Sequence, residues 1–314
     1  MASYIARRLL ATIPVILLIS AITFFAIALL PGDPVLAVLG EEADTTTVAA
    51  IREQLGLDRP VLVRYLDWIG NAIQGDFGRS LRAGNDVSTL LSKRLEVTLE
   101  LGILAMIVAV MIGIPIGLLA GARPNTPFDY GGTIFAVLGA AIPNFWLALM
   151  LVLFFSVRLG WFPTTGFTPF LDDPVENLRS LVLPAVAIGV FQSAILARQT
   201  RAALVEVLRQ DYVRTAYAKG LRERTVIVRH AFRNALIPVV TVLGIQVSTI
   251  VGGAIIIETV FALPGVGKLL IDSIFQREVL TVQAIALLLA TTVALANLVV
   301  DVSYAFLDPR IRYA

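Results

Sequence analysis

Few side chains in this sequence could carry out chemistry of their own. A phosphate-binding loop needs two glycines at fixed spacing, then a Lys and a hydroxyl residue, so that backbone N–H groups cradle the phosphates. The closest match runs from Gly265 to Lys268, with Ala262 in place of the upstream Gly and Leu269 in place of the hydroxyl. The sequence therefore predicts that this chain does not hydrolyse ATP itself.

The sequence also lacks the residue patterns for a zinc site and for nucleophilic catalysis. The single histidine, His230, is followed by Ala231, so a His-Glu-x-x-His zinc site cannot form. The sequence contains no cysteine, which excludes disulfides, thiolate metal sites and cysteine nucleophiles. Because His230 lies in a polar, basic segment, no Ser–His pair can be built within a bilayer. We therefore expect no catalytic residue, no metal ligand and no cofactor in this chain, and an intramembrane protease is excluded.

The composition is that of a membrane protein. Of 314 residues, 57% are hydrophobic and only 15% are charged, and the mean hydropathy is +0.84. Soluble domains carry about 25% charged residues, so much of this chain does not need water. The formal net charge of +2 does not suggest a nucleic-acid partner. Membrane lipid is the expected surrounding.

The predicted fold is an all-α integral membrane protein with six transmembrane helices. A helix needs about 20 mostly apolar residues to cross a bilayer. The first span is expected to be an uncleaved helix, because no small-x-small cleavage site follows it before Pro31. Gln192 and Ser193 interrupt the fourth span, and Gly113, Gly117 and Gly121 form a small-residue stripe that favours close helix packing within the bundle. The stretches that qualify are about 9–30, 97–121, 131–157, 180–200, 235–257 and 283–306.

Basic residues in one connection fix the expected orientation. Segment 198–233 contains only three acids, Glu206, Asp211 and Glu223, among many basic residues. Positive charge is retained on the cytoplasmic side, so this segment is predicted to lie inside, with both termini inside and segment 31–96 outside. The basic residues of the segment are Arg198, Arg201, Arg209, Arg214, Lys219, Arg222, Arg224, Arg229 and Arg233.

Charges near the spans do not form a relay. Glu96, Glu100, Glu258 and Asp301 all fall near predicted helix ends, where pairing or snorkelling accounts for them; Asp301 has Arg310 and Arg312 as candidate partners. The pattern argues against a proton-coupled secondary transporter, and no filter-like loop suggests a channel.

The cytoplasmic segment has an ordered pattern of its own. Residues from Thr200 to Lys219 favour a helix, and Gly220 stands where that helix would stop, because Gly accepts the left-handed conformation of a helix C′ position. A second short helix is expected from about Arg222 to Asn234. Helix, Gly and helix together predict a docking projection on the cytoplasmic face.

This segment resembles the coupling loop of ABC-importer permeases. It is similar to the motif sequence of the dipeptide and oligopeptide branch. The matching residues are Asp211-Tyr-Val-Arg-Thr-Ala-Tyr-Ala-Lys-Gly220, followed by Leu236-Ile237-Pro238. The general Glu-Ala-Ala motif is matched only in part, since Arg214 and Thr215 replace its Glu and first Ala. The resemblance extends along nearly the whole chain. Other matching pieces are 30–34, 54–58, 75–80, 159–163, 261–268 and 308–313.

The resemblance implies a type I ABC-importer permease of the peptide, glutathione and nickel family, in the cell inner membrane. It implies a first transmembrane helix at 1–30, an extracytoplasmic insert at 31–96, a permease core at 94–305 and a cytoplasmic coupling loop at 198–233. Implied partners are a second homologous permease subunit, two cytoplasmic ATPase subunits that bind ATP and Mg, and an extracytoplasmic substrate-binding protein. The residues that the resemblance places at the ATPase contact are Tyr212, Arg214, Thr215, Ala216, Lys219 and Gly220.

The expected cargo is a di- or oligopeptide, or a glutathione-like peptide. A nickel-complex importer of the same family is the alternative, and a secondary transporter is a weaker one. Few His, Cys and Met residues are present to ligate a transition metal, which favours peptide over nickel.

Overall fold

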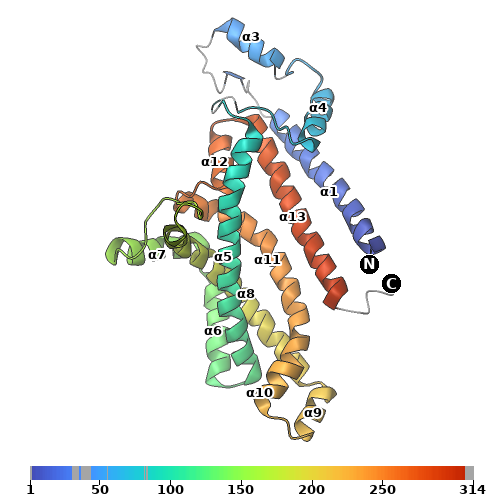
Figure 1. Ribbon diagram of the computed structural model, residues 1–314, viewed down its shortest axis with the longest axis vertical. Coiled ribbons are helices and arrows are strands. Elements are labelled where there is room, and N and C mark those ends of the chain that lie inside the picture. Colours follow the sequence, from blue (N-terminus) through green and yellow to red (C-terminus); the bar gives the residue numbers. More distant parts are fainter. Residues whose placement is uncertain are drawn as a thin grey trace. The chain divides into compact units, whose positions relative to one another are not determined.

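The computed structural model describes residues 2–29, 35–36, 44–54, 56–80, 82 and 84–307, and most of them are helical (Figure 1). The chain divides into two compact units. One unit contains Leu99–Leu263 and the chain from Ala296, and the other, which we call the insert unit, contains Ala2–Thr98 and Pro264–Leu295.

Among the described residues, five helices are long and apolar enough to cross a bilayer on their own. They confirm the first, second, fourth, fifth and sixth predicted spans, and several extend beyond the apolar stretch that predicted them. They are α1 (Ala2–Ala28), α5 (Val87–Ala122), α8 (Pro174–Leu208), α11 (Arg233–Val260) and α13 (Val279–Leu307).

The third predicted span, 131–157, is not one straight helix. It consists of α6 (Pro127–Ala141) and α7 (Asn144–Leu151), which continues as the π-helical segment η1 (Val152–Arg158). The pair bends by 98° at a short break. Ile142 has an extended ψ of 123°, because the ring of Pro143 disfavours the α conformation in the residue before it. Counted as one span, the bent pair brings the number of crossings to six.

Helix α8 packs against α6, α7 and α11. The glycine stripe of α5 also lies against α8: a Cβ at Gly113 would stand 2.7 Å from the carbonyl oxygen of Ser193, and one at Gly121 would stand 3.1 Å from that of Arg201. The stripe is therefore used for packing within the chain, as the sequence predicted.

Polar residues of α8 face α11 rather than lipid. The Gln192 side chain donates from Nε2 to Thr249 Oγ1 at 2.7 Å, and Gln246 Nε2 donates to the Gln192 carbonyl at 2.8 Å. Both glutamines are only 2% exposed. These contacts explain how the interrupted fourth span is accommodated, since a polar side chain in a bundle is tolerated where it bonds a neighbouring helix.

The acidic residues near the ends of the spans lie in different environments. Glu100 accepts a hydrogen bond from Asn177 Nδ2 at 3.0 Å, and Glu258 is fully buried. The expected partners of Asp301, at 310 and 312, lie outside the described residues.

The insert unit combines segments from both ends of the chain. It contains the short helices α3 (Thr45–Gln54) and α4 (Val61–Ile73), and α4 packs on α1. The start of α5 packs on α12 (Val266–Phe275) and α13 through Val87, Leu91, Val266, Ala284 and Ile285. Helix α12 and much of α13 thus lie in the same compact unit as α3 and α4, and the core expected over 94–305 stays a prediction.

Candidate coupling site at the connection between α8 and α11

The polar connection between α8 and α11 folds into short helices. Helix α9 (Asp211–Ala218) is followed by a turn, by α10 (Glu223–Thr225) and by the π-helical segment η2 (Val226–Phe232), which runs directly into α11. We call residues 211–225 the coupling knob. In Figure 1, α9 and α10 lie at one end of the α8 and α11 pair.

Two expectations about these helices were wrong in detail. The helix expected over 200–219 is interrupted, because Gln210 takes an extended conformation (ψ 148°) between the end of α8 and Asp211. The helix expected over 222–234 does not stop before Pro238, since η2 and α11 continue through it. The turn at Gln210 lets α9 fold back on α8, and the continuous helix ties the far end of the knob to a membrane span.

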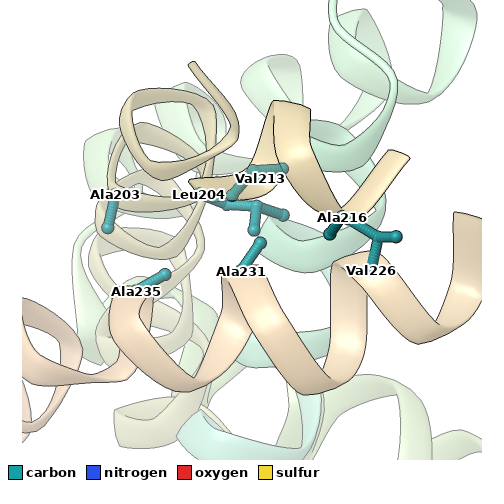
Figure 2. Packing of buried hydrophobic residues seen from close by; sticks show 7 residues of the cluster. All are labelled: Ala203, Leu204, Val213, Ala216, Val226, Ala231 and Ala235. Atoms are coloured by element: carbon teal, nitrogen blue, oxygen red, sulfur yellow. The ribbon is translucent and has the colours of Figure 1, made fainter. Parts of the chain in front are cut away.

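A small hydrophobic core holds the knob against both spans. Figure 2 shows the Leu204 side chain of α8 beside Val213 and Ala231, and Ala216 beside Val226. Leu204, Val213, Val226 and Ala231 are completely buried. The core buries residues of α8, α9, η2 and α11 together, so apolar burial favours movement of the knob with these helices as one body. Its buried members are Ala203, Leu204, Val213, Ala216, Val226, Ala231 and Ala235.

Gly220 ends α9 in the conformation that the sequence predicted. Its φ is +74°, in the left-handed region. The Gly220 N–H donates to the Tyr217 carbonyl at 2.9 Å, and the Leu221 N–H donates to the Ala216 carbonyl at 3.4 Å. These two bonds form a Schellman motif, which satisfies carbonyls that a helix end would otherwise leave open. A Cβ at Gly220 would meet nothing within 4 Å, so the backbone angle is the reason for glycine here.

A tyrosine fastens α9 to the start of α11. Asn234 Nδ2 donates to Tyr212 Oη at 2.7 Å, and Tyr212 Oη lies 3.5 Å from the His230 carbonyl that it can donate to. Tyr212 is nonetheless 43% exposed, so its ring borders the outer surface of the knob. His230, the single histidine, contributes its backbone carbonyl to this contact.

Among the residues predicted to contact the ATPase subunit, most are exposed on the knob, and Ala216 is buried. Arg214, Thr215 and Lys219 are exposed on α9 and at its end, and Arg214 lies 3.7 Å from Asp211 in a fully solvated pair. Ala216 is buried and packs in the core, so its part is to position the helix. Burial and the nearby Glu223 carboxylate raise the pKa of the Tyr217 phenol, which therefore stays protonated at physiological pH.

The sequence analysis missed an ion pair that joins α6 to α8, in which Asp129 is buried and Arg201 is partly exposed. Arg201 Nη2 donates to Asp129 Oδ2 at 2.8 Å, and Arg201 Nε bonds Asp129 Oδ1. Asp129 also accepts from the Asn125 N–H at 2.9 Å, and it is only 3% exposed. An acid in the first turn of a helix that begins with Pro127 was the available signal, since carboxylates favour helix N-termini.

Comparison with known protein families shows which family this chain belongs to. The model for "Binding-protein-dependent transport system inner membrane component" matches residues 113–313. The model for "Binding-prot-dependent transport system membrane comp, N-term" matches residues 1–102. The chain belongs to this family of inner membrane components. It is thus a multi-pass protein of the inner membrane, in agreement with its apolar helices.

Similar curated proteins match this family member from end to end. A putative peptide transport system permease protein of Brucella abortus is 44% identical over 313 residues, which covers 100% of each chain. The oligopeptide transport system permease protein AppB of Bacillus subtilis is 42% identical over 316 residues, again with 100% of both chains covered. The glutathione transport system permease protein GsiC of Salmonella typhi is 42% identical over 313 residues, with the same coverage.

A solved structure shares the fold. A chain of the MetNI methionine ABC transporter, in inward-facing conformations, aligns with a TM-score of 0.58 at 20% identity. The alignment covers 70% of this chain and 96% of that chain. The permease fold of this inner membrane component is therefore that of ABC importers.

Proposed function

We propose that this chain is one permease subunit of an ATP-driven importer of di- and oligopeptides, and that the coupling knob receives the motion of an ATPase subunit. The working assembly contains a second homologous permease subunit, two cytoplasmic ATPase subunits and an extracytoplasmic binding protein. Closure of the ATPase pair on ATP moves the knob, and the permease bundles then alternate access between the two sides of the membrane.

The shared core of the knob and the spans carries this proposal. Leu204, Val213 and Ala231 come from α8, α9 and η2, and all three are completely buried. The Tyr212–Asn234 bond ties α9 to α11 as well. A knob that was only a tether would not need its apolar side chains buried against two spans. Because it is packed this way, a push on α9 displaces both helices.

The exposed residues of the knob suit a protein contact on the cytoplasmic side. Arg214, Lys219 and Tyr212 are exposed together on or beside α9. Arg and Tyr are enriched at protein interfaces, where they supply charge, hydrogen bonds and apolar area at once. The excess of basic residues in 198–233 supports a cytoplasmic position for this surface, and the 31–96 insert then lies outside.

ATP hydrolysis belongs to the partner subunits. Gly265, which begins the loop-like run, is the N-cap of α12, and Lys268 donates to both oxygens of Asp272, at 2.9 and 3.2 Å. That Lys is engaged by a carboxylate of its own helix, unlike a Lys that must bind phosphate. The departures from the phosphate-loop pattern at Ala262 and Leu269 support the same conclusion.

The relatives support peptide as the cargo. Proteins named for peptide, oligopeptide and glutathione transport are each more than 40% identical to this chain along its whole length. A short peptide is the chemical class that these names share.

Uptake by the reconstituted assembly tests this function. We expect proteoliposomes with both permeases and the ATPase subunits to accumulate labelled tri-alanine only with ATP, and faster with the loaded binding protein outside. The purified chain alone should show no ATPase activity. ATP turnover by the isolated chain, or uptake driven by a proton gradient without ATP, would contradict the proposal.

A further inference from the structure

The insert unit contains a partly open cavity of about 540 Å³, within the size range of small-molecule sites. Its wall is formed by α1, the end of α3 and the turn that follows it, α4, the loop after α4, and the start of α13. Aromatic residues Phe24 and Trp68 lie on the wall, with ring centroids 5.8 Å apart. All of these residues belong to the same compact unit.

Two arginines of this wall, the partly buried Arg64 and the exposed Arg277, have no acidic partner among the described residues. The Arg64 guanidinium is half-buried and lies 6.0 Å from the centroid of the Phe24 ring. Burial lowers the pKa of Arg64, because desolvation disfavours the charged form. The two remaining arginines of the wall differ, since Arg59 pairs with Asp67 at 3.1 Å and Arg79 pairs with Asp86 at 3.4 Å.

Two orphaned polar atoms border the same cavity. Trp68 Nε1 and Gln283 Oε1 are buried without a hydrogen-bond partner in the part of the chain that the structure describes. Trp68 is 8% exposed and Gln283 is 2% exposed. Buried polar atoms of native proteins are nearly always paired. A ligand in the cavity would satisfy this donor and this acceptor once the two side chains turn toward it, since neither atom has accessible surface in the present conformation.

The cavity also carries negative charge. Glu53 and Asp76 line it without an ion-pair partner among the described residues. Glu278 is 7% exposed and accepts hydrogen bonds from Ser80 Oγ at 2.7 and 2.9 Å and from the Arg82 N–H at 2.9 Å. A phosphate or an anionic lipid headgroup would meet these carboxylates as like charges. A zwitterion meets Arg64 with its carboxylate and the acids with its ammonium group.

We propose that this cavity binds a short zwitterionic peptide, with Arg64 holding the C-terminal carboxylate and the Glu53 and Asp76 side facing the N-terminal ammonium. The site rests on the proposed function and deepens it, because it gives the peptide a binding place on the insert before it enters the membrane. Peptide N–H and C=O groups are the partners that Gln283 and Trp68 lack.

Direct binding tests the site. The complete assembly in nanodiscs, without binding protein, is titrated with tri-alanine, with tri-alanine amide and with N-acetyl-tri-alanine. We expect tri-alanine to bind at least tenfold more tightly than its amide, the change that loss of a charge-assisted hydrogen bond produces. Arg64→Gln should weaken tri-alanine binding at least tenfold. It should leave amide binding nearly unchanged, because the amide already lacks the carboxylate that Arg64 binds.

Matched variants separate the site from general charge effects. Lys93→Gln removes the same charge from an exposed position of the same unit, outside the cavity wall, and should change binding less than twofold. Arg64→Lys keeps the charge and should recover much of the affinity. If Arg64→Gln does not assemble, the comparison of the three peptides on the unaltered assembly still decides.

Several outcomes would overturn the site. They are equal binding of tri-alanine and its amide, unaltered binding by Arg64→Gln, and displacement of tri-alanine by inorganic phosphate at equal concentration. ATP-driven peptide uptake measured on the same preparation keeps the two proposals apart. Uptake without direct binding would remove the site and leave the transport function standing.

Discussion

At Gly220 the backbone takes an angle that side chains other than glycine avoid. We expect Gly220→Val to cost about 1–2 kcal/mol of local conformational energy, because a β-branched residue is strained at φ +74°. That strain is too small to unfold the bundle but large enough to shift the end of α9. Subunit abundance should remain normal, while peptide uptake per ATP hydrolysed falls severalfold in proteoliposomes.

Two control variants make this prediction specific. Gly160 has φ +65° and, like Gly220, no atom within 4 Å of an added Cβ, so Gly160→Val imposes similar strain far from the knob along the chain. It should leave coupling unchanged. Gly220→Asn should be milder than Gly220→Val, since Asn tolerates the left-handed region. Unchanged uptake per ATP in Gly220→Val would show that the knob is a passive tether.

Residues differ in how far the sequence could predict them. The left-handed turn at Gly220 depends on a few neighbouring positions, so the sequence predicted its conformation. The Asp129–Arg201 pair joins residues 72 positions apart, and no local pattern reveals such a contact. Ala216 matched the family motif, but only the packed structure shows that it faces the core rather than a partner.

At the scale of elements, the contact of α5 with α8 depends on the absence of side chains. A Cβ at Gly117 would stand 2.6 Å from the Thr200 Cβ, closer than real Cβ contacts. We expect Gly117→Ala to destabilise the assembly by about 1–3 kcal/mol, the usual cost of overpacking, and to lower the thermal midpoint measured in detergent.

A glycine on a neighbouring helix supplies the matched control. Gly131 lies within α6 and has no atom within 4 Å of an added Cβ. Gly131→Ala should be neutral or stabilise by up to about 1 kcal/mol, because Ala favours a helix more than Gly does. Equal midpoints for the two variants would mean that α5 and α8 do not pack as closely as described.

Elements were predicted well where hydrophobicity alone determines them. Long apolar runs predicted the five spans that are single helices. The break at Pro143 could not be predicted in the same way, since Pro115, Pro184 and Pro238 lie inside continuous helices. Tertiary contacts decide which proline interrupts a helix and which is absorbed.

At the scale of the whole molecule, the topology depends on the bent pair of α6 and α7. If the pair crosses the membrane, 198–233 is cytoplasmic and the connection before α8 is outside. If the pair re-enters on the same side, both of these segments exchange sides. The basic residues of 198–233 favour the first arrangement, because positive connections are retained in the cytoplasm.

Single cysteines distinguish the two arrangements, since the sequence contains none of its own. We expect an impermeant maleimide to label Leu171→Cys and Asp44→Cys in intact cells, and Thr215→Cys only after the membrane is opened. All three positions are exposed, with Leu171 at 88%, so access to the reagent depends on the side of the membrane. Asp44, which precedes α3, serves as the fixed reference because it does not depend on the bent pair. Labelling of Thr215→Cys but not Leu171→Cys in intact cells, with Asp44→Cys unchanged, would show that α6 and α7 form a re-entrant loop. The coupling knob would then lie outside, and the proposed ATPase contact would be wrong.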